Sequence, residues 1–190
     1  MTEIEETKNA AEPGQAAAGK KKKKGKKRGI RSLQDFALEV LVCVAILYVL
    51  FAHIIGICQM PTADMYPGIG SGDFLLYYRL DKDPKAQDVV VLTKNDTRYV
   101  ARVVAVAGDT IEIKKDGTIV INGYTMQETN IFYETYPLKG FTEYPLTLQD
   151  GECFVMADRR GETEDSRFYG PVKYKELDGT VLSVFRRTNL

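Results

Sequence analysis

An apolar run near the start of the chain restricts the possible fold more than any other feature. The 19 residues 40–58 read VLVCVAILYVLFAHIIGIC and contain no Lys, Arg, Asp or Glu. A helix of this length spans ~28 Å, close to the hydrocarbon thickness of a bilayer. A cleaved signal peptide is the alternative, but it normally has a shorter apolar core and an A-x-A-like cleavage site. The sequence therefore predicts an uncleaved transmembrane helix at residues 38–58.

A basic cluster precedes this run. Nine of the residues 20–31 are Lys or Arg. Because positive charge beside a transmembrane helix favours the cytoplasmic side, we expect a cytoplasmic tail at residues 1–31 and an extracytoplasmic domain at residues 59–190. The composition of the tail predicts disorder. Its cations would also contact anionic lipid headgroups, so membrane lipid is an expected partner.

The net charge of zero hides an uneven distribution. Residues 1–39 hold ten of the 26 basic and six of the 26 acidic side chains, which leaves 16 basic and 20 acidic ones downstream. A mildly acidic domain is not expected to bind nucleic acid. The three cysteines are scattered, and the one histidine, His53, lies in the apolar run. We therefore expect no metal site and no cofactor.

The chain after residue 59 reads as β structure. Runs of β-branched and aromatic residues bounded by turn residues predict strands near residues 74–80, 88–93, 98–106, 152–157 and 179–187. Alternating apolar and polar residues around Asp116-Gly117 predict a hairpin. Residues 124–149 are irregular and predict an insertion that borders a site. The expected fold class is mainly β, an antiparallel β-sheet domain behind one N-terminal transmembrane helix.

Few routes to catalysis are open outside the apolar run. Without a histidine there, neither a Ser-His-Asp nor a Cys-His arrangement can form. A carboxylate pair is the other option, with five candidates: Asp64, Asp73, Asp109, Asp158 and Asp165. Asp73 and Asp109 each follow a glycine, which suits turns, and the last two lie in an arginine-rich stretch, which suits salt bridges. The pattern does not favour an aspartic-type dyad.

Four segments that follow the apolar run match a set of short motifs. PTADMYPGI is similar to P-S-G-S-M-x-P-T-L, and GDFLLYYR is similar to the G-D strand that follows it. YVARVVAVAGDTI is similar to Y-V-K-R-V-x-G-x-P-G-D, and VMADRRGETEDSRFYGPV to V-x-G-D-N-R-x-x-S-x-D-S-R-x-x-G-x-V. From about residue 38 to residue 190 the chain thus resembles bacterial type I signal peptidases. The resemblance implies a membrane-anchored, all-β serine endopeptidase that uses a lysine as general base.

Both catalytic residues that the resemblance implies are replaced. The serine position falls on Asp64 and the lysine position on Ala101. Alanine cannot accept a proton, and a carboxylate is a weak nucleophile toward a peptide. Losing such a set of residues typically costs about 10⁶-fold in rate. Arg102 cannot replace the lysine, because a guanidinium stays protonated.

Other positions of the motifs are retained. Thr62 matches the hydroxyl residue that serves the oxyanion, Met65 and Pro67 match the loop that shapes the site, and Thr163 matches the serine that supports the lysine. With Asp64, these residues are expected to form a substrate groove or oxyanion-like site. The matches with a structural role are Asp158 and Arg160 of the G-D-N-R turn and the acid–base pair Asp165 and Arg167.

The D-M-Y-P loop resembles more closely a subset of signal-peptidase-like proteins encoded beside the pilins of Gram-positive bacteria. This implies a single-pass cell-membrane pseudoenzyme that binds secreted or pilin polypeptides and assists pilus assembly, with sortase machinery as a further partner. An extended peptide would add to a strand edge, where Asp64 would favour a peptide N–H or a basic side chain. Two alternatives remain: Asp64 caps a turn and the groove binds nothing, or the protein is an active signal peptidase.

Overall fold

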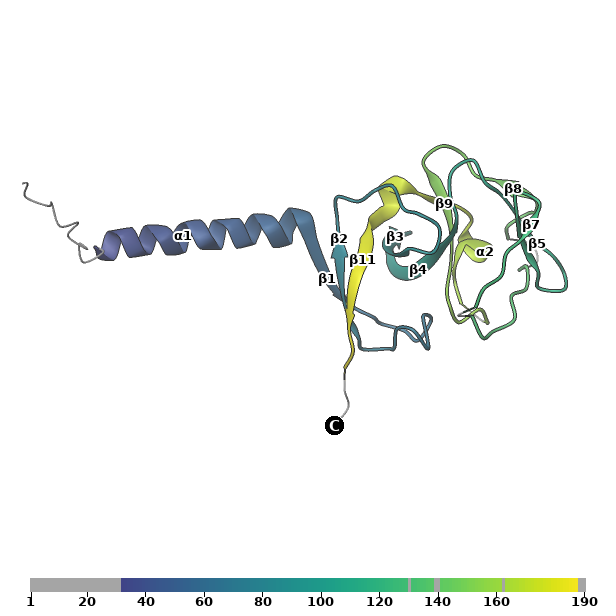
Figure 1. Cartoon of the computed structure of the whole chain (residues 1–190), viewed down its shortest axis with the longest axis horizontal. Coiled ribbons are helices and arrows are strands. Elements are labelled where there is room, and N and C mark those ends of the chain that lie inside the picture. The colour runs from purple at the N-terminus through teal and green to yellow at the C-terminus, as the bar shows by residue number, and fades with distance from the viewer. Residues whose placement is uncertain (1–31, 130, 139–140, 162, 188–190) are drawn as a thin grey trace, which may run out of the picture.

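The structure is a computed structural model that describes residues 32–129, 131–138, 141–161 and 163–187 (Figure 1). The tail expected at residues 1–31 lies outside the described residues. A helical segment projects away from a β domain, into which it leads directly (Figure 1).

The helical segment combines α1 (Leu33–Val49) with a π-helical turn, η1 (Leu50–Ile54). Ser32 and Asp35 cap its start, since each side chain accepts a hydrogen bond from the backbone N–H of the other. This capping box satisfies N–H groups that the first turn leaves without helical partners. Of these 22 helical residues, an 18-residue window has a mean hydropathy of 2.4, and none of the residues in that window is buried in the protein. By length and composition the segment can cross a membrane.

The observed helical segment and the span expected at residues 38–58 overlap but differ at both ends. The capping box moves the start to Leu33, and residues 55–58 belong to a strand instead of the helix. This strand, β1 (Ile55–Gln59), pairs antiparallel with β2 (Phe74–Tyr78). Pairing with a distant strand ends the helix here, and hydrophobic periodicity alone does not report such pairing.

Seven strands form the main sheet, in the order β1-β2-β11-β3-β4-β9-β10. Its described strand pairs are all antiparallel. The further strands are β3 (Val89–Lys94), β4 (Thr97–Ala105), β9 (Glu152–Met156), β10 (Val172–Lys173) and β11 (Leu177–Phe185). Both faces of β4 are buried: Val100 packs with Met60 and Met65, whereas Ala101 packs with Val155. The sheet therefore carries a hydrophobic cluster on each side.

A second sheet has four short strands in the order β7-β6-β5-β8. These are β5 (Thr110–Ile113), β6 (Ile119–Ile121), β7 (Tyr124–Thr125) and β8 (Leu146–Thr147). β5 and β6 form the hairpin expected around Asp116-Gly117. The stretch 124–149 contains β7 and β8 near its ends. One short helix, α2 (Ser166–Tyr169), and a 3-10 turn, η2 (Tyr174–Glu176), complete the described elements. The predicted mainly β, antiparallel fold class is confirmed.

Candidate functional site

The loop between β1 and β2 is fixed at both ends. The Met60 N–H donates to the Asp73 carbonyl at 2.8 Å. The Asp73 carboxylate in turn accepts from the N–H groups of Gly70 at 2.9 Å and Arg187 at 3.0 Å. These bonds, that from Arg187 first, lower the pKa of Asp73. Met65 lies fully buried beneath the loop, in the core cluster with Met60. The loop is therefore held against the sheet and not left free.

Asp64 is half-buried in this loop, close to the exposed Thr62. Its carboxylate accepts a hydrogen bond from the Thr62 hydroxyl, with 2.5 Å between Thr62 Oγ1 and Asp64 Oδ2. Its backbone carbonyl accepts from the Arg159 N–H at 2.7 Å. The first contact commits the Thr62 proton to Asp64, and the second ties the loop to the turn that follows β9.

An open pocket of about 570 Å³ lies beside Asp64. The loop contributes Met60, Pro61, Thr62 and Asp64, the start of β4 contributes Thr97, Arg98, Tyr99 and Val100, and the turn before α2 contributes Thr163 and Glu164. Three of the residues expected to form the site, Thr62, Asp64 and Thr163, thus lie together. Met65 supports the loop from the core, and Pro67 is exposed and does not line the pocket.

The polar groups of the pocket mostly bond to one another. Tyr99 donates its hydroxyl to Glu164 Oε2 at 3.0 Å. Burial, then this bond to Glu164, raises the pKa of Tyr99, which therefore remains a proton donor. Thr163 donates its hydroxyl to the Arg159 carbonyl at 3.1 Å. Among the described lining residues are two carboxylates and one guanidinium, that of Arg98, but no serine, lysine or histidine.

Ala101 lies beside the pocket without lining it. Ala101 is only 2 % exposed and belongs to the core cluster that contains Cys153 and Val155. The next residue, Arg102, donates to Asp158 through Nε at 2.8 Å and through Nη2 at 2.6 Å. The hydrogen bonds to Asp158 raise the pKa of Arg102 and keep it a cation. Neither residue can act as a general base.

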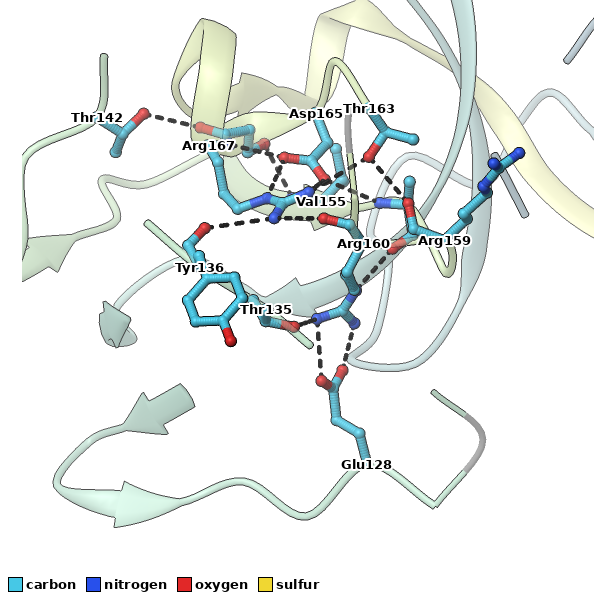
Figure 2. A network of polar contacts seen from close by, with 12 residues as sticks. Glu128, Thr135, Tyr136, Thr142, Val155, Arg159, Arg160, Thr163, Asp165 and Arg167 are labelled. Atoms are coloured by element: carbon cyan, nitrogen blue, oxygen red, sulfur yellow. Dashed lines mark hydrogen bonds and ion pairs between the residues drawn. The ribbon is translucent and has the colours of Figure 1, made fainter. Parts of the chain in front are cut away.

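Two further arginines, Arg160 in the turn after β9 and Arg167 in α2, belong to a buried network (Figure 2). Arg167 donates to the Asp165 carboxylate through Nε at 2.9 Å and through Nη2 at 2.8 Å. Arg160 donates to Ala157 O at 2.6 Å and to both carboxylate oxygens of Glu128. Asp158 and Arg160, which the motif placed in one turn, therefore take different partners.

Sequence reasoning missed several of these partners. Glu128 is an isolated acid in an irregular stretch. Glu164 lies within the last of the four motifs, but the motif assigns it no role. Arg102 was considered only as a substitute for the lysine, although it holds Asp158. No spacing pattern marks these pairs, because the partners lie 32 residues apart for Arg160 and Glu128 and 56 apart for Arg102 and Asp158.

The family model described as "Signal peptidase, peptidase S26" matches residues 33–186. The chain belongs to this family. It is 34 % identical over 116 residues to signal peptidase I S of Bacillus subtilis, which covers 54 % of the chain and 62 % of that protein. It is 26 % identical over 166 residues to signal peptidase I of Bacillus licheniformis, covering 81 % and 89 % respectively.

Two other proteins are similar to parts of this chain. Thylakoidal processing peptidase 1 of Arabidopsis thaliana is 26 % identical over 145 residues, 67 % of the chain and 40 % of that protein. The chain thus spans less than two thirds of this relative and of the B. subtilis protein. A crystal structure of signal peptidase I from Enterococcus faecalis V583 aligns with a TM-score of 0.43 and 29 % identity, covering 53 % of the chain and 97 % of that structure.

Proposed function

We propose that this protein is a signal peptidase homologue without Ser/Lys catalysis. It is anchored in the cell membrane with a cytoplasmic N-terminus, binds extended segments of secreted or pilin polypeptides, and assists the assembly of surface pili. The observation that carries the proposal is the state of Asp64. Asp64 lies at the position of the family's serine nucleophile, and its carboxylate accepts a hydrogen bond from the Thr62 hydroxyl. It lines a pocket whose described residues include no serine or lysine.

Catalysis by the Ser/Lys route needs a hydroxyl nucleophile beside a neutral amine. Three residues could in principle replace the missing pair: Ser71, Ser166 and Lys94. Ser71 does not line the pocket, and its hydroxyl donates to the Pro61 carbonyl at 3.5 Å. Lys94 donates through Nζ to the Pro171 carbonyl at 2.6 Å and lies 3.4 Å from a Glu176 oxygen. Ser166 is fully buried and accepts from the Val155 N–H. Neither lines the pocket, which supports binding without cleavage.

The start of β4 offers a backbone edge for an extended ligand. Residues 97–102 of β4 pair with β3 on one side. On the other side, the described pairing with β9 begins only at Arg102. The stretch from Thr97 to Ala101 therefore has one edge without a strand partner among the described residues, next to the pocket. An extended peptide could add to this edge through backbone hydrogen bonds, with its side chains reaching into the pocket.

The position of the β domain supports contact with membrane lipid. β1 follows the helical segment without a linker. In the described register Phe74 of β2 lies opposite Phe185 of β11, and both are exposed, as is Ile57 of β1. The register places Tyr78 opposite Ile55, directly after the helix, and Phe74 opposite Gln59, at the far end of β1. The exposed apolar side chains of these strands suit contact with the bilayer interface. The basic cluster at residues 20–31 supports a cytoplasmic location for the other end.

Family membership favours one alternative, an active signal peptidase that processes secreted proteins. The test compares the natural full-length chain in detergent with the variant Asp64→Ser/Ala101→Lys on a labelled secretory precursor. We expect the natural chain to leave the precursor intact while forming a complex with it. Cleavage by the natural chain at the rate of the double variant would establish the active alternative.

The assembly role needs a separate test in the host cell. The gene is deleted and replaced by the natural gene, by Asp64→Arg, which places a cation in the pocket, or by the control Asp150→Asn at an exposed turn. Loss of polymerised surface pili with Asp64→Arg and their recovery with Asp150→Asn are expected. Unchanged pili in the deletion strain would remove the assembly role.

A further inference from the structure

The pocket contains two carboxylates that form no ion pair with any residue the structure describes. Asp64 comes from the loop after β1, and Glu164 from the turn before α2. Within the described residues, their bonds are to the hydroxyls of Thr62 and Tyr99, and neither forms an ion pair. Each carboxylate has two oxygens that together accept about four hydrogen bonds, so one hydroxyl leaves most of this capacity unused.

Three of the four hydroxyls in the described lining of the pocket cannot supply donors to a ligand. Thr62 and Tyr99 donate to the two carboxylates, and Thr163 donates to the Arg159 carbonyl. A hydroxyl has a single proton, so these three are already committed. A ligand side chain that enters the pocket therefore meets mainly acceptors and must bring its own donors.

Arg98, the cation among the described lining residues, is paired with an acid outside the pocket. Arg98 donates through Nε to Asp178 Oδ2 at 3.2 Å. With this pair neutral, the charges of Asp64 and Glu164 remain, and the pocket has a negative balance. A recessed site of one sign of charge attracts the opposite sign and repels its own.

We propose that the pocket selects an extended segment that carries a lysine or arginine side chain, whose cationic end is bound by Asp64 and Glu164 together. This rests on the proposed peptide-binding function and names the ligand class of the same site. The backbone of the segment lies along the free edge of β4, and the basic side chain reaches between the loop and the turn. Segments with a glutamate at that position are excluded by repulsion.

The test measures binding of fluorescent host peptides to the full-length chain in detergent. The peptides are acetylated and amidated, consist of Ala, Gly and Thr, and carry at each position in turn a lysine, the uncharged norleucine or a glutamate. We expect the best lysine peptide to bind roughly tenfold more tightly than its norleucine counterpart, from two partly exposed charge pairs. Glutamate at that position should abolish binding, and high salt should reduce the preference for lysine.

Isosteric variants assign the preference to the two acids. Asp64→Asn and Glu164→Gln should each reduce the ratio of the affinities for the lysine and norleucine peptides to about threefold. The double variant should reduce this ratio to about one. Asp150→Asn, the exposed control, should leave it unchanged. Equal affinity for lysine and norleucine peptides would overturn the inference, but it would leave the proposed peptide-binding function intact. A preference that persists in the double variant would also overturn it, and absence of binding by every host peptide would remove both the inference and the proposed function.

Discussion

Replacement of Glu128 by glutamine tests how the irregular segment is held against the sheet. The Glu128 carboxylate is the only anion bonded to Arg160 in the described network, with a bond of 2.9 Å from Nη1 and a second from Nη2. The Arg160 side chain is 0 % exposed and that of Glu128 is 13 % exposed. The other acceptors of Arg160 are neutral, namely Thr135 Oγ1 at 3.0 Å and Ala157 O at 2.6 Å. The variant therefore leaves a buried guanidinium without a counter-charge.

The expected cost follows from this burial. Removing one partner of a buried ion pair typically costs about 3–5 kcal/mol of stability, whereas an exposed pair is worth about 0–1 kcal/mol. The matched control is Asp178→Asn, because its partner Arg98 is 53 % exposed and Asp178 is 24 % exposed. With a shift of roughly 2–4 °C per kcal/mol for a chain of this size, Glu128→Gln should lower the Tm by roughly 6–20 °C.

The assay is thermal unfolding of the full-length chain in detergent, followed by far-UV circular dichroism. Limited proteolysis between β7 and β8 provides a local measurement, and we expect faster cleavage there in Glu128→Gln. A third variant, Glu128→Gln/Arg160→Met, removes the unpaired charge and should recover part of the lost stability. Equal Tm shifts for Glu128→Gln and Asp178→Asn would refute the reasoning from burial.

Three further predictions follow from particular residues. The N–H groups of Arg187 and Gly70 lower the pKa of Asp73 in the folded protein below its ordinary value of 3.8. The ionised Asp73 therefore stabilises the fold fully above pH 3.8, and this stabilisation is lost as the pH falls through the pKa of the folded state. Denaturant unfolding should thus show Asp73→Asn to be less stable than the natural chain at neutral pH, with a gap that shrinks in acid; a gap independent of pH would contradict this. Burial raises the pKa of Cys153 to about 12, so in a variant without the other two cysteines a maleimide should label it no faster than the protein unfolds. Labelling at the rate of a free thiol would show that the site is open. Gly117→Ala should cost about 1–3 kcal/mol, because φ is +89° and the new Cβ would lie 2.7 Å from the Thr135 carbonyl oxygen. Gly108→Ala is the control, because Gly108 has a similar φ of +86° but no atom within 4 Å of the new Cβ. It introduces backbone strain without a steric clash and should lower the free energy of unfolding by less in the same assay.

Features that depend on neighbouring residues could be predicted from the sequence. The apolar run predicts a helix long enough to cross a membrane, and the alternation around Asp116-Gly117 predicts the hairpin of β5 and β6. The close spacing of Thr62 and Asp64 already puts both on one loop. These predictions succeed because periodicity and turn geometry are set within a few residues of chain.

Features that depend on distant pairing were decided by the tertiary structure. The helix ends at Ile54 because β1 pairs with β2, although the apolar pattern continues to residue 58. The contact between Tyr99 and Glu164 joins residues 65 apart in the chain. Only the folded sheet brings the start of β4 beside the turn before α2.

The replaced catalytic pair shows the same division. Asp64 and Ala101 were identified as substituted positions from sequence motifs. Their surroundings were not: Asp64 lines an open pocket with Glu164, whereas Ala101 lies in the core. Residue identity is written in the sequence, but the charge balance of a pocket depends on which side chains converge from separate strands and on which partners neutralise them. Long-range strand pairing determines which side chains converge and which partners neutralise them, and no local sequence pattern encodes this pairing.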